Sequence, residues 1–242
     1  MSIGVSQNVA LALPSRVRIA AGLEEAVELI DRADTAGIYL RSSFPEHRDL
    51  PRAVQTFIES QHIEIRFDNH PVRTVESSVS EALREYGFPE GHDQVLSSMA
   101  ADVATIAKAV EMIAGASDLV QVRISSQWVR GPSWHLDPNR IVGKHVYIGP
   151  GTQIVEDSDV LDFDRTTEIR VRDEAEFYSV PSQWIAISRG SRWVSIGPDG
   201  EKVWSRGLVH RRPPDPWGGC PPRRLIALVF QDRPDAPQFV GP

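Results

Sequence analysis

Residues 119–125 read LVQVRIS and residues 141–148 read IVGKHVYI, two short runs rich in β-branched residues. Such runs favour β-strands. Gly, Pro and Asp residues separate them from further short runs of the same kind: TQIV (152–155), TEIRVR (167–172), QWIAIS (183–188), RWVSI (192–196), EKVWS (201–205), GLVH (207–210) and RLIALVF (224–230). Many short strands with turn signals between them are typical of a β-sandwich or a β-barrel.

The chain before residue 117 mixes helix and strand. Its clearest helix is predicted over 94–114, where apolar residues recur every three to four positions and Gly115 follows as a stop signal. Shorter helices are predicted over 22–33, 50–59 and 75–86, and strands over 36–42 and 62–67.

Helices followed by many strands predict an α+β fold, specifically a jelly-roll or cupin-like barrel (a double-stranded β-helix) with an N-terminal helical layer packed on one sheet. We expect one domain over residues 1–242. It would comprise a mixed part (1–117), a β-rich core (118–232) and a loose tail (233–242).

The 242 residues carry 33 Asp and Glu against 26 Lys and Arg, a net charge of −7. This balance argues against binding to nucleic acid or to an anionic membrane, because both require a basic surface. No apolar run approaches a membrane span, and no basic segment precedes the short N-terminal apolar run, so we expect a cytoplasmic protein of bacterial type. A single cysteine, Cys220, excludes a disulfide framework and leaves His, Asp and Glu to hold any metal.

One motif carries the chemistry. His135 and Asp137 are two residues apart, and in an extended segment such residues face the same side. Pro138 favours the extended conformation at Asp137. His210 ends the strand-like run GLVH. Two histidines and one carboxylate form the facial triad of non-haem Fe(II) oxygenases, although an isolated H-x-D also occurs as an ordinary loop contact.

The order of these motifs resembles the Fe(II)/2-oxoglutarate-dependent dioxygenase superfamily: an H-x-D, a distal His, and an Arg (Arg223 or Arg224) that opens the last apolar strand. The stretches YIGPGT (147–152) and GLVHRRPP (207–214) are similar to a family of uncharacterised bacterial proteins that share a domain of unknown function.

The resemblance implies Fe(II) as the metal and 2-oxoglutarate as the co-substrate. His135, Asp137 and His210 match the metal-binding and catalytic triad. Arg224, or its neighbour Arg223, matches the residue that pairs with the far carboxylate of 2-oxoglutarate. The implied reaction uses O₂ to hydroxylate a C–H bond of a small-molecule or amino-acid-like substrate.

Several neighbouring residues are candidates for contacts with the ligands. Tyr147 matches a residue that touches the same carboxylate of 2-oxoglutarate, and His145 shares its strand parity, so both are predicted inside the barrel, where packing is the alternative role. Trp134 could line the substrate pocket or pack in the core. Arg211 and Arg212 could attract an anionic substrate or could be solvated loop charges.

A second function remains open from the sequence: a non-catalytic, cupin-like protein that binds Zn(II) or Fe(II) in metal homeostasis. Two histidines and a carboxylate also suit Zn(II). The sequence does not identify the substrate or the oligomeric state.

Overall fold

The structure, a computed structural model, describes residues 13–115, 117–126, 133–162, 167–191, 193–196, 202–204, 206–213 and 225–231. Within these ranges the helices are α1 (Leu23–Ile30), α2 (Arg52–Ser60), α3 (Val75–Glu85) and α4 (Asp93–Ala114). The strands are β1 (Val17–Ala20), β2 (Gly37–Arg41), β3 (Glu64–Pro71), β4 (Leu119–Ser125), β5 (Ile141–Ile148), β6 (Gln153–Val155), β7 (Phe177–Ser179), β8 (Trp184–Arg189), β9 (Val194–Ile196), β10 (Lys202–Trp204), β11 (His210–Arg211) and β12 (Leu225–Gln231).

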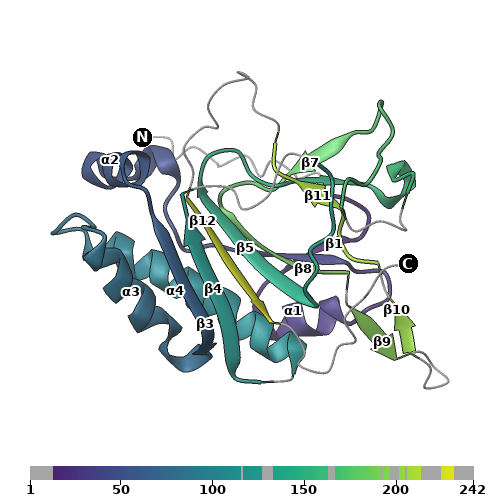
Figure 1. Ribbon diagram of the computed structural model, residues 1–242, viewed down its shortest axis with the longest axis horizontal. Coiled ribbons are helices and arrows are strands. Elements are labelled where there is room, and N and C mark those ends of the chain that lie inside the picture. The colour runs from purple at the N-terminus through teal and green to yellow at the C-terminus, as the bar shows by residue number, and fades with distance from the viewer. Residues whose placement is uncertain are drawn as a thin grey trace, which may run out of the picture.

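A seven-stranded sheet forms the centre of the molecule, in the order β1-β2-β8-β5-β12-β4-β3 (Figure 1). Its described pairings are antiparallel except that of β1 with β2. Strands from both halves of the chain contribute, because β1, β2 and β3 precede residue 117, and β2 pairs with β8 and β3 with β4. A three-stranded sheet, β11-β6-β7, and the two-stranded β9-β10 complete the described strands.

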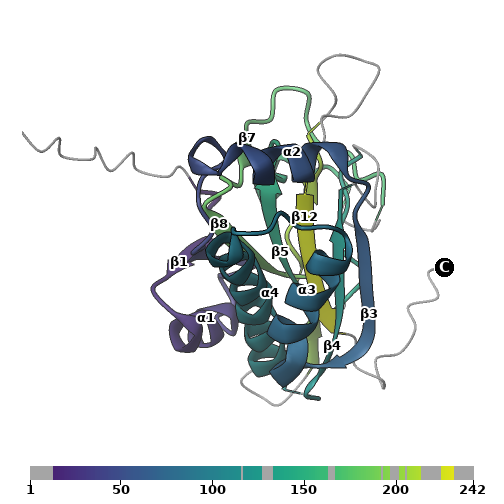
Figure 2. The ribbon, with the colours of Figure 1, turned by 90° about the vertical axis from the view of Figure 1, so that its left-hand side faces the viewer.

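The helices pack on one face of the large sheet (Figure 2). Helix α4 lies against β5, β12, β4 and β8. The contact is close at Gly143 of β5, where an added Cβ would lie 2.2 Å from Cγ2 of Ile106 on α4. The apolar stripe of α4 therefore forms the main core with the helix-facing side chains of the sheet.

Strand β5 is buried along its whole length. One face meets α4, and the opposite face lines a pocket to which Val142 and Lys144 contribute. A strand covered on both faces needs apolar residues at nearly every position, which explains the run IVGKHVYI.

The structure confirms an α+β chain with a helical layer on a large sheet. The predicted strand over 167–172 is wrong: Thr167 makes an isolated bridge to His135 and Val171 another to Val160, so the two ends pair with different segments. Closure of the sheets into a barrel stays a prediction. Among the described helices, none is both long enough and apolar enough to cross a membrane.

Candidate metal centre

The two histidines of the predicted triad lie directly opposite each other. The backbone N–H of His135 donates to the carbonyl of His210 over 2.9 Å, and the N–H of His210 donates back over 3.0 Å. The two residues thus form a hydrogen-bonded pair in an isolated antiparallel bridge. Residues paired in this way have their side chains on the same face. The ring centroids are 4.5 Å apart.

Asp137 reaches the same point because it lies two residues beyond His135 in an extended segment. Its Oδ2 lies 3.3 Å from Nε2 of His210. One ligand atom from each of His135, Asp137 and His210 falls within 4.8 Å of the other two. Two ligands about 2.1 Å from a metal and at right angles lie about 3 Å apart, and Asp137 and His210 have nearly that spacing.

Backbone carbonyls orient both imidazoles. Nδ1 of His135 donates to the carbonyl of Ser133 over 2.9 Å, and Nδ1 of His210 donates to that of Leu208 over 2.8 Å. Each proton on Nδ1 leaves the Nε2 lone pair directed at the common point. Metal-binding histidines are held in this way, so the donor set fits a divalent metal such as Fe(II).

The charge distribution also suits metal binding. Burial, with His210 beside it, lowers the pKa of His135 from 6.5 to about 3, so this ligand is neutral at pH 7. Burial alone would raise the pKa of Asp137, but the Lys144 ammonium and His210 outweigh it and hold that pKa well below 3.8. The site therefore offers a lone pair and a carboxylate at neutral pH.

Sequence reasoning missed Lys144, which lies at the centre of the site. Its Nζ donates to Oδ2 of Asp137 over 3.1 Å and to Nε2 of His210 over 2.9 Å. Only 8% of its side chain is exposed. The ammonium therefore contacts two of the three atoms that a metal would use, and a metal that binds all three must displace it.

A pocket with a volume of about 270 Å³ adjoins the triad. The inner face of the large sheet forms one wall, and the segments of His210 and the H-x-D form another. Its lining includes the triad, Asn139 and an apolar group, Val142, Ile226, Leu228 and Phe230. The site thus combines a charged end with an apolar body, as small-molecule sites do.

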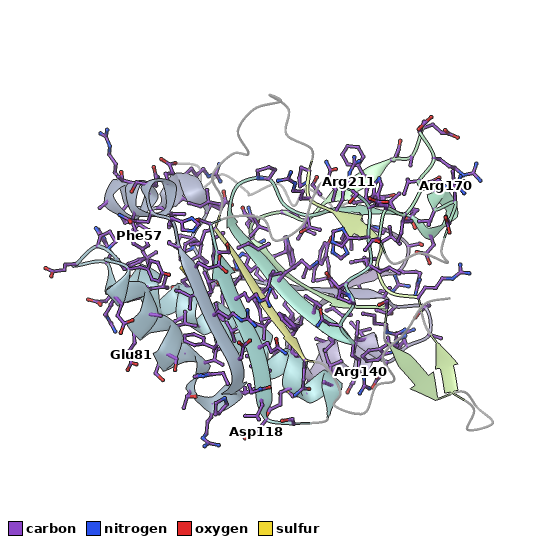
Figure 3. All side chains as sticks on the ribbon, in the orientation of Figure 1. Phe57, Glu81, Asp118, Arg140, Arg170 and Arg211 are labelled. Carbon is purple, nitrogen blue, oxygen red and sulfur yellow. The ribbon has the colours of Figure 1, made fainter. Side chains whose placement is uncertain are left out.

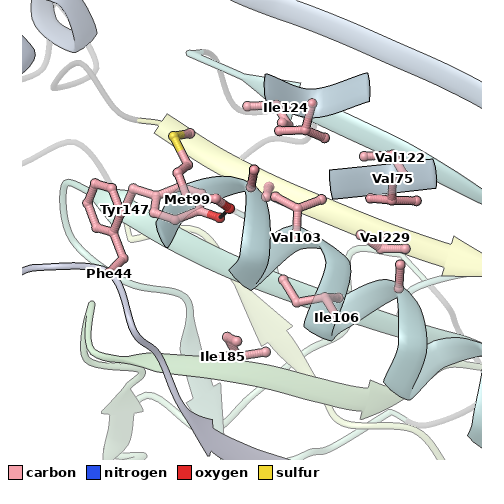
Figure 4. Packing of buried hydrophobic residues seen from close by; sticks show 14 of the residues in the cluster. Phe44, Val75, Met99, Val103, Ile106, Val122, Ile124, Tyr147, Ile185 and Val229 are labelled. Carbon is pink, nitrogen blue, oxygen red and sulfur yellow. Dashed lines mark hydrogen bonds between the residues drawn. The ribbon is translucent and has the colours of Figure 1, made fainter. Parts of the chain in front are cut away.

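The predictions for Tyr147 and His145 are corrected by the sheet orientation. Both side chains lie on the opposite face of β5 from Lys144, under α4. Figure 4 shows Tyr147 there among the core residues. The Tyr147 hydroxyl donates to the carbonyl of Met99 over 3.2 Å. Nδ1 of His145 lies 3.2 Å from Oδ2 of Asp102, and its Nε2 donates to the carbonyl of Ser182. The two residues share a face of β5, as predicted, but that face meets α4 and not the pocket.

Trp134 and Arg211 alternate with the triad histidines and therefore point away from the pocket. The Arg211 guanidinium lies 4.2 Å from the Trp134 ring and 5.5 Å from that of Phe177, on the β11 side of the molecule (Figure 3). Its neighbour Arg212 lines the pocket instead. Arg223, Arg224 and Cys220 fall outside the described ranges, so their predicted roles stay predictions.

Several solved oxygenase structures resemble the chain at low identity. The dioxygenase for auxin oxidation from rice is 13% identical over 90% of this chain and 82% of its own, with a TM-score of 0.44. A putative oxygenase from Shewanella oneidensis is 14% identical over 91% and 90%, with a TM-score of 0.41. A putative 2OG-Fe(II) oxygenase family protein from Caulobacter crescentus is 14% identical over 87% and 81%, with a TM-score of 0.37. At these values the likeness identifies no activity.

No curated protein matches the sequence. A family model does match residues 34–228, described as a protein of unknown function (DUF1826). The matched region begins before β2, ends within β12 and includes the whole triad. The predicted similarity to a family with a domain of unknown function is thereby confirmed at the level of the family, and the chain belongs to the DUF1826 family.

Proposed function

We propose that this protein is an Fe(II)- and 2-oxoglutarate-dependent oxygenase that hydroxylates a C–H bond of a small molecule. The observation that carries the proposal is the convergence of His135, Asp137 and His210, with both imidazoles presenting Nε2 to one point. Two histidines and one carboxylate leave the opposite side of a metal open to other ligands. We also infer that the large and small sheets are the two halves of a jelly-roll barrel.

We assign a separate role to each group of residues at the site. His135, Asp137 and His210 would hold Fe(II), and Arg224 or Arg223 would bind the far carboxylate of 2-oxoglutarate. Bound Fe(II) with 2-oxoglutarate supplies activation of O₂ and oxidation of a C–H bond. Val142, Leu228 and their apolar neighbours exclude water from the pocket and fix the substrate beside the triad.

Anaerobic titration tests this function directly. Fe(II) followed by 2-oxoglutarate should produce a weak visible charge-transfer band, and metal affinity should fall sharply in His135→Ala. His62→Ala, at an exposed histidine outside the pocket, is the matched control and should behave as wild type. Absence of the band together with unchanged metal affinity in His135→Ala would overturn the proposal. Stabilisation by Zn(II) with no response to 2-oxoglutarate would indicate a non-catalytic metal binder instead.

A further inference from the structure

The pocket is cationic in a chain whose net charge is −7. Its lining contains three cationic side chains, Arg123, Lys144 and Arg212, against the single carboxylate of Asp137. Lys144 is paired with that carboxylate. No other acidic residue lines the pocket in the described ranges, so Arg123 and Arg212 bring positive charge that the lining leaves uncompensated.

Arg123 projects from the large sheet on the same face as the triad lysine. Lys144 of β5 is opposite Leu228 of β12, and Leu228 is opposite Arg123 of β4. The three side chains therefore form one row across the sheet, with roughly 10 Å between the first and third strands. The guanidinium lies 5.5 Å from the ring of Phe230. A ligand that extends from the metal position along this row meets Arg123 at its far end.

Several polar atoms on both walls of the pocket lack partners among the described residues. Within that part of the chain, Nε of Arg123 and Nε of Arg212 are buried without a hydrogen-bond partner, and the same holds for Oγ1 of Thr152. Buried polar groups in native structures are nearly always hydrogen-bonded, so these atoms point to a missing ligand. Arg212 lies two residues beyond His210, and continuing the β11–β6 register sets it opposite Thr152. Donors thus face the pocket from both sheets.

The ligand that fits these donors is an anion with an apolar body. A guanidinium binds a carboxylate or a phosphate through two parallel hydrogen bonds. Leu228, however, lies between Arg123 and Lys144 in this row, and Phe230 and Val142 line the pocket from the adjacent row, so that the pocket suits an aliphatic or aromatic group. We propose that the acceptor substrate is a small apolar organic acid whose oxyanion is bound by Arg123, with further donors from Arg212 and Thr152. This assignment rests on the proposed oxygenase function for its chemistry.

Binding measurements test the assignment separately from turnover. The full-length protein is titrated calorimetrically with hexanoate, phenylacetate and phenyl phosphate, and with the neutral hexanamide and phenylacetamide. The titrations are done without metal and again with Ni(II) and 2-oxoglutarate. We expect at least one acid to bind tenfold or more tightly than its amide, in both states. A preference for phenyl phosphate would assign the oxyanion to phosphate within the same proposal.

Arg123→Met should weaken that acid at least tenfold and leave the affinity for 2-oxoglutarate with Ni(II) unchanged. Arg123→Lys keeps the charge but loses the paired donors, so it should show an intermediate loss of affinity for the acid. This variant tests the proposal even if Arg123→Met fails to fold. Arg66→Met is the matched control: Arg66 is opposite Arg123 on β3, but it is exposed and paired with Asp68. It should bind the acid as wild type does.

Three results would overturn the assignment: equal affinity for acids and amides, unchanged acid binding in Arg123→Met and Arg123→Lys, or loss of 2-oxoglutarate binding in Arg123→Met. The last would place the co-substrate, and not the acceptor, at Arg123. Failure of the oxygenase proposal is distinguishable, because acid binding to the metal-free protein does not require the Fe(II) and 2-oxoglutarate band.

Discussion

Replacing Lys144 with methionine should destabilise the metal-free protein and raise its affinity for a metal ion. The Lys144 ammonium lies 3.1 Å from Oδ2 of Asp137, and the two side chains are 8% and 15% exposed. At that distance two unit charges attract by roughly 5 kcal/mol at an effective dielectric constant of 20. Desolvation of both groups offsets part of this attraction. Removal of one partner, however, leaves the other charge buried and unpaired, which costs about 3–5 kcal/mol.

A loss of about 3 kcal/mol corresponds to a fall in Tm of roughly 6–12 °C for a chain of this size. The fall should be seen in the metal-free protein with a chelator present. With Ni(II) bound, the metal replaces the ammonium as the partner of Asp137, so the difference in Tm should largely disappear. Metal affinity should rise at least tenfold, which is about 1.4 kcal/mol, because no ammonium remains to be displaced.

Differential scanning calorimetry and competitive metal titration measure the two effects. Lys108→Met is the control, since Lys108 lies on the exposed surface of α4 and pairs with Glu111. It should lower Tm by no more than about 2 °C, because an exposed pair contributes only about 0.3–0.5 kcal/mol. If Lys144→Met were as stable as wild type without metal and bound Ni(II) no more tightly, then Lys144 would not occupy the position of the metal.

Three further substitutions probe the helical layer and the outer face of the site. Asp102→Asn should cost about 1–3 kcal/mol in chemical denaturation, because the buried carboxylate accepts hydrogen bonds from Ser42 and Ser43 that the amide satisfies only in part. The folded-state pKa of Asp102 is lowered from 3.8, so its stabilising effect is complete above pH 4 and disappears as the pH falls through the lower value; the gap between wild type and variant should narrow in acid. Gly143→Ala should cost about 1–3 kcal/mol through overlap with Ile106, and an Ile106→Ala double mutant should be less destabilised than the sum of the single changes. Arg211→Ala should cost under about 1 kcal/mol and leave Ni(II) affinity unchanged, because its guanidinium stacks on aromatic rings outside the pocket; a loss of Ni(II) binding would contradict that placement.

Local sequence signals predicted most of the described elements. Helix α4 follows its apolar spacing to within one residue of the predicted start, and Gly115 ends it with φ of 61°. Strands β4 and β5 have the predicted bounds. The convergence of His135 with Asp137 also followed from the sequence, because i and i+2 side chains of an extended segment share a face. The approach of His210 to His135 was expected only from the resemblance to a known superfamily.

The sequence could not show which face of β5 meets the site. Both faces are buried, so hydrophobic alternation does not distinguish the face of His145 and Tyr147 from the face of Lys144. Strand β4 does show a clear alternation, in which polar Gln121, Arg123 and Ser125 alternate with apolar residues, but the alternation is misleading about the pocket. Such a polar face normally meets solvent, whereas at Arg123 it lines a pocket.

Packing of the helical layer influences the geometry of the candidate metal centre through strand β5. Gly143 lets α4 approach the backbone of β5 too closely for a side chain, so the position of this strand in the sheet is fixed from the helix side. The adjacent residue, Lys144, points the other way and contacts Asp137 and His210. A shift of β5 would move the Lys144 amine relative to the triad. We therefore expect core substitutions at this contact to alter metal affinity as well as stability, although they lie on the far face of the sheet.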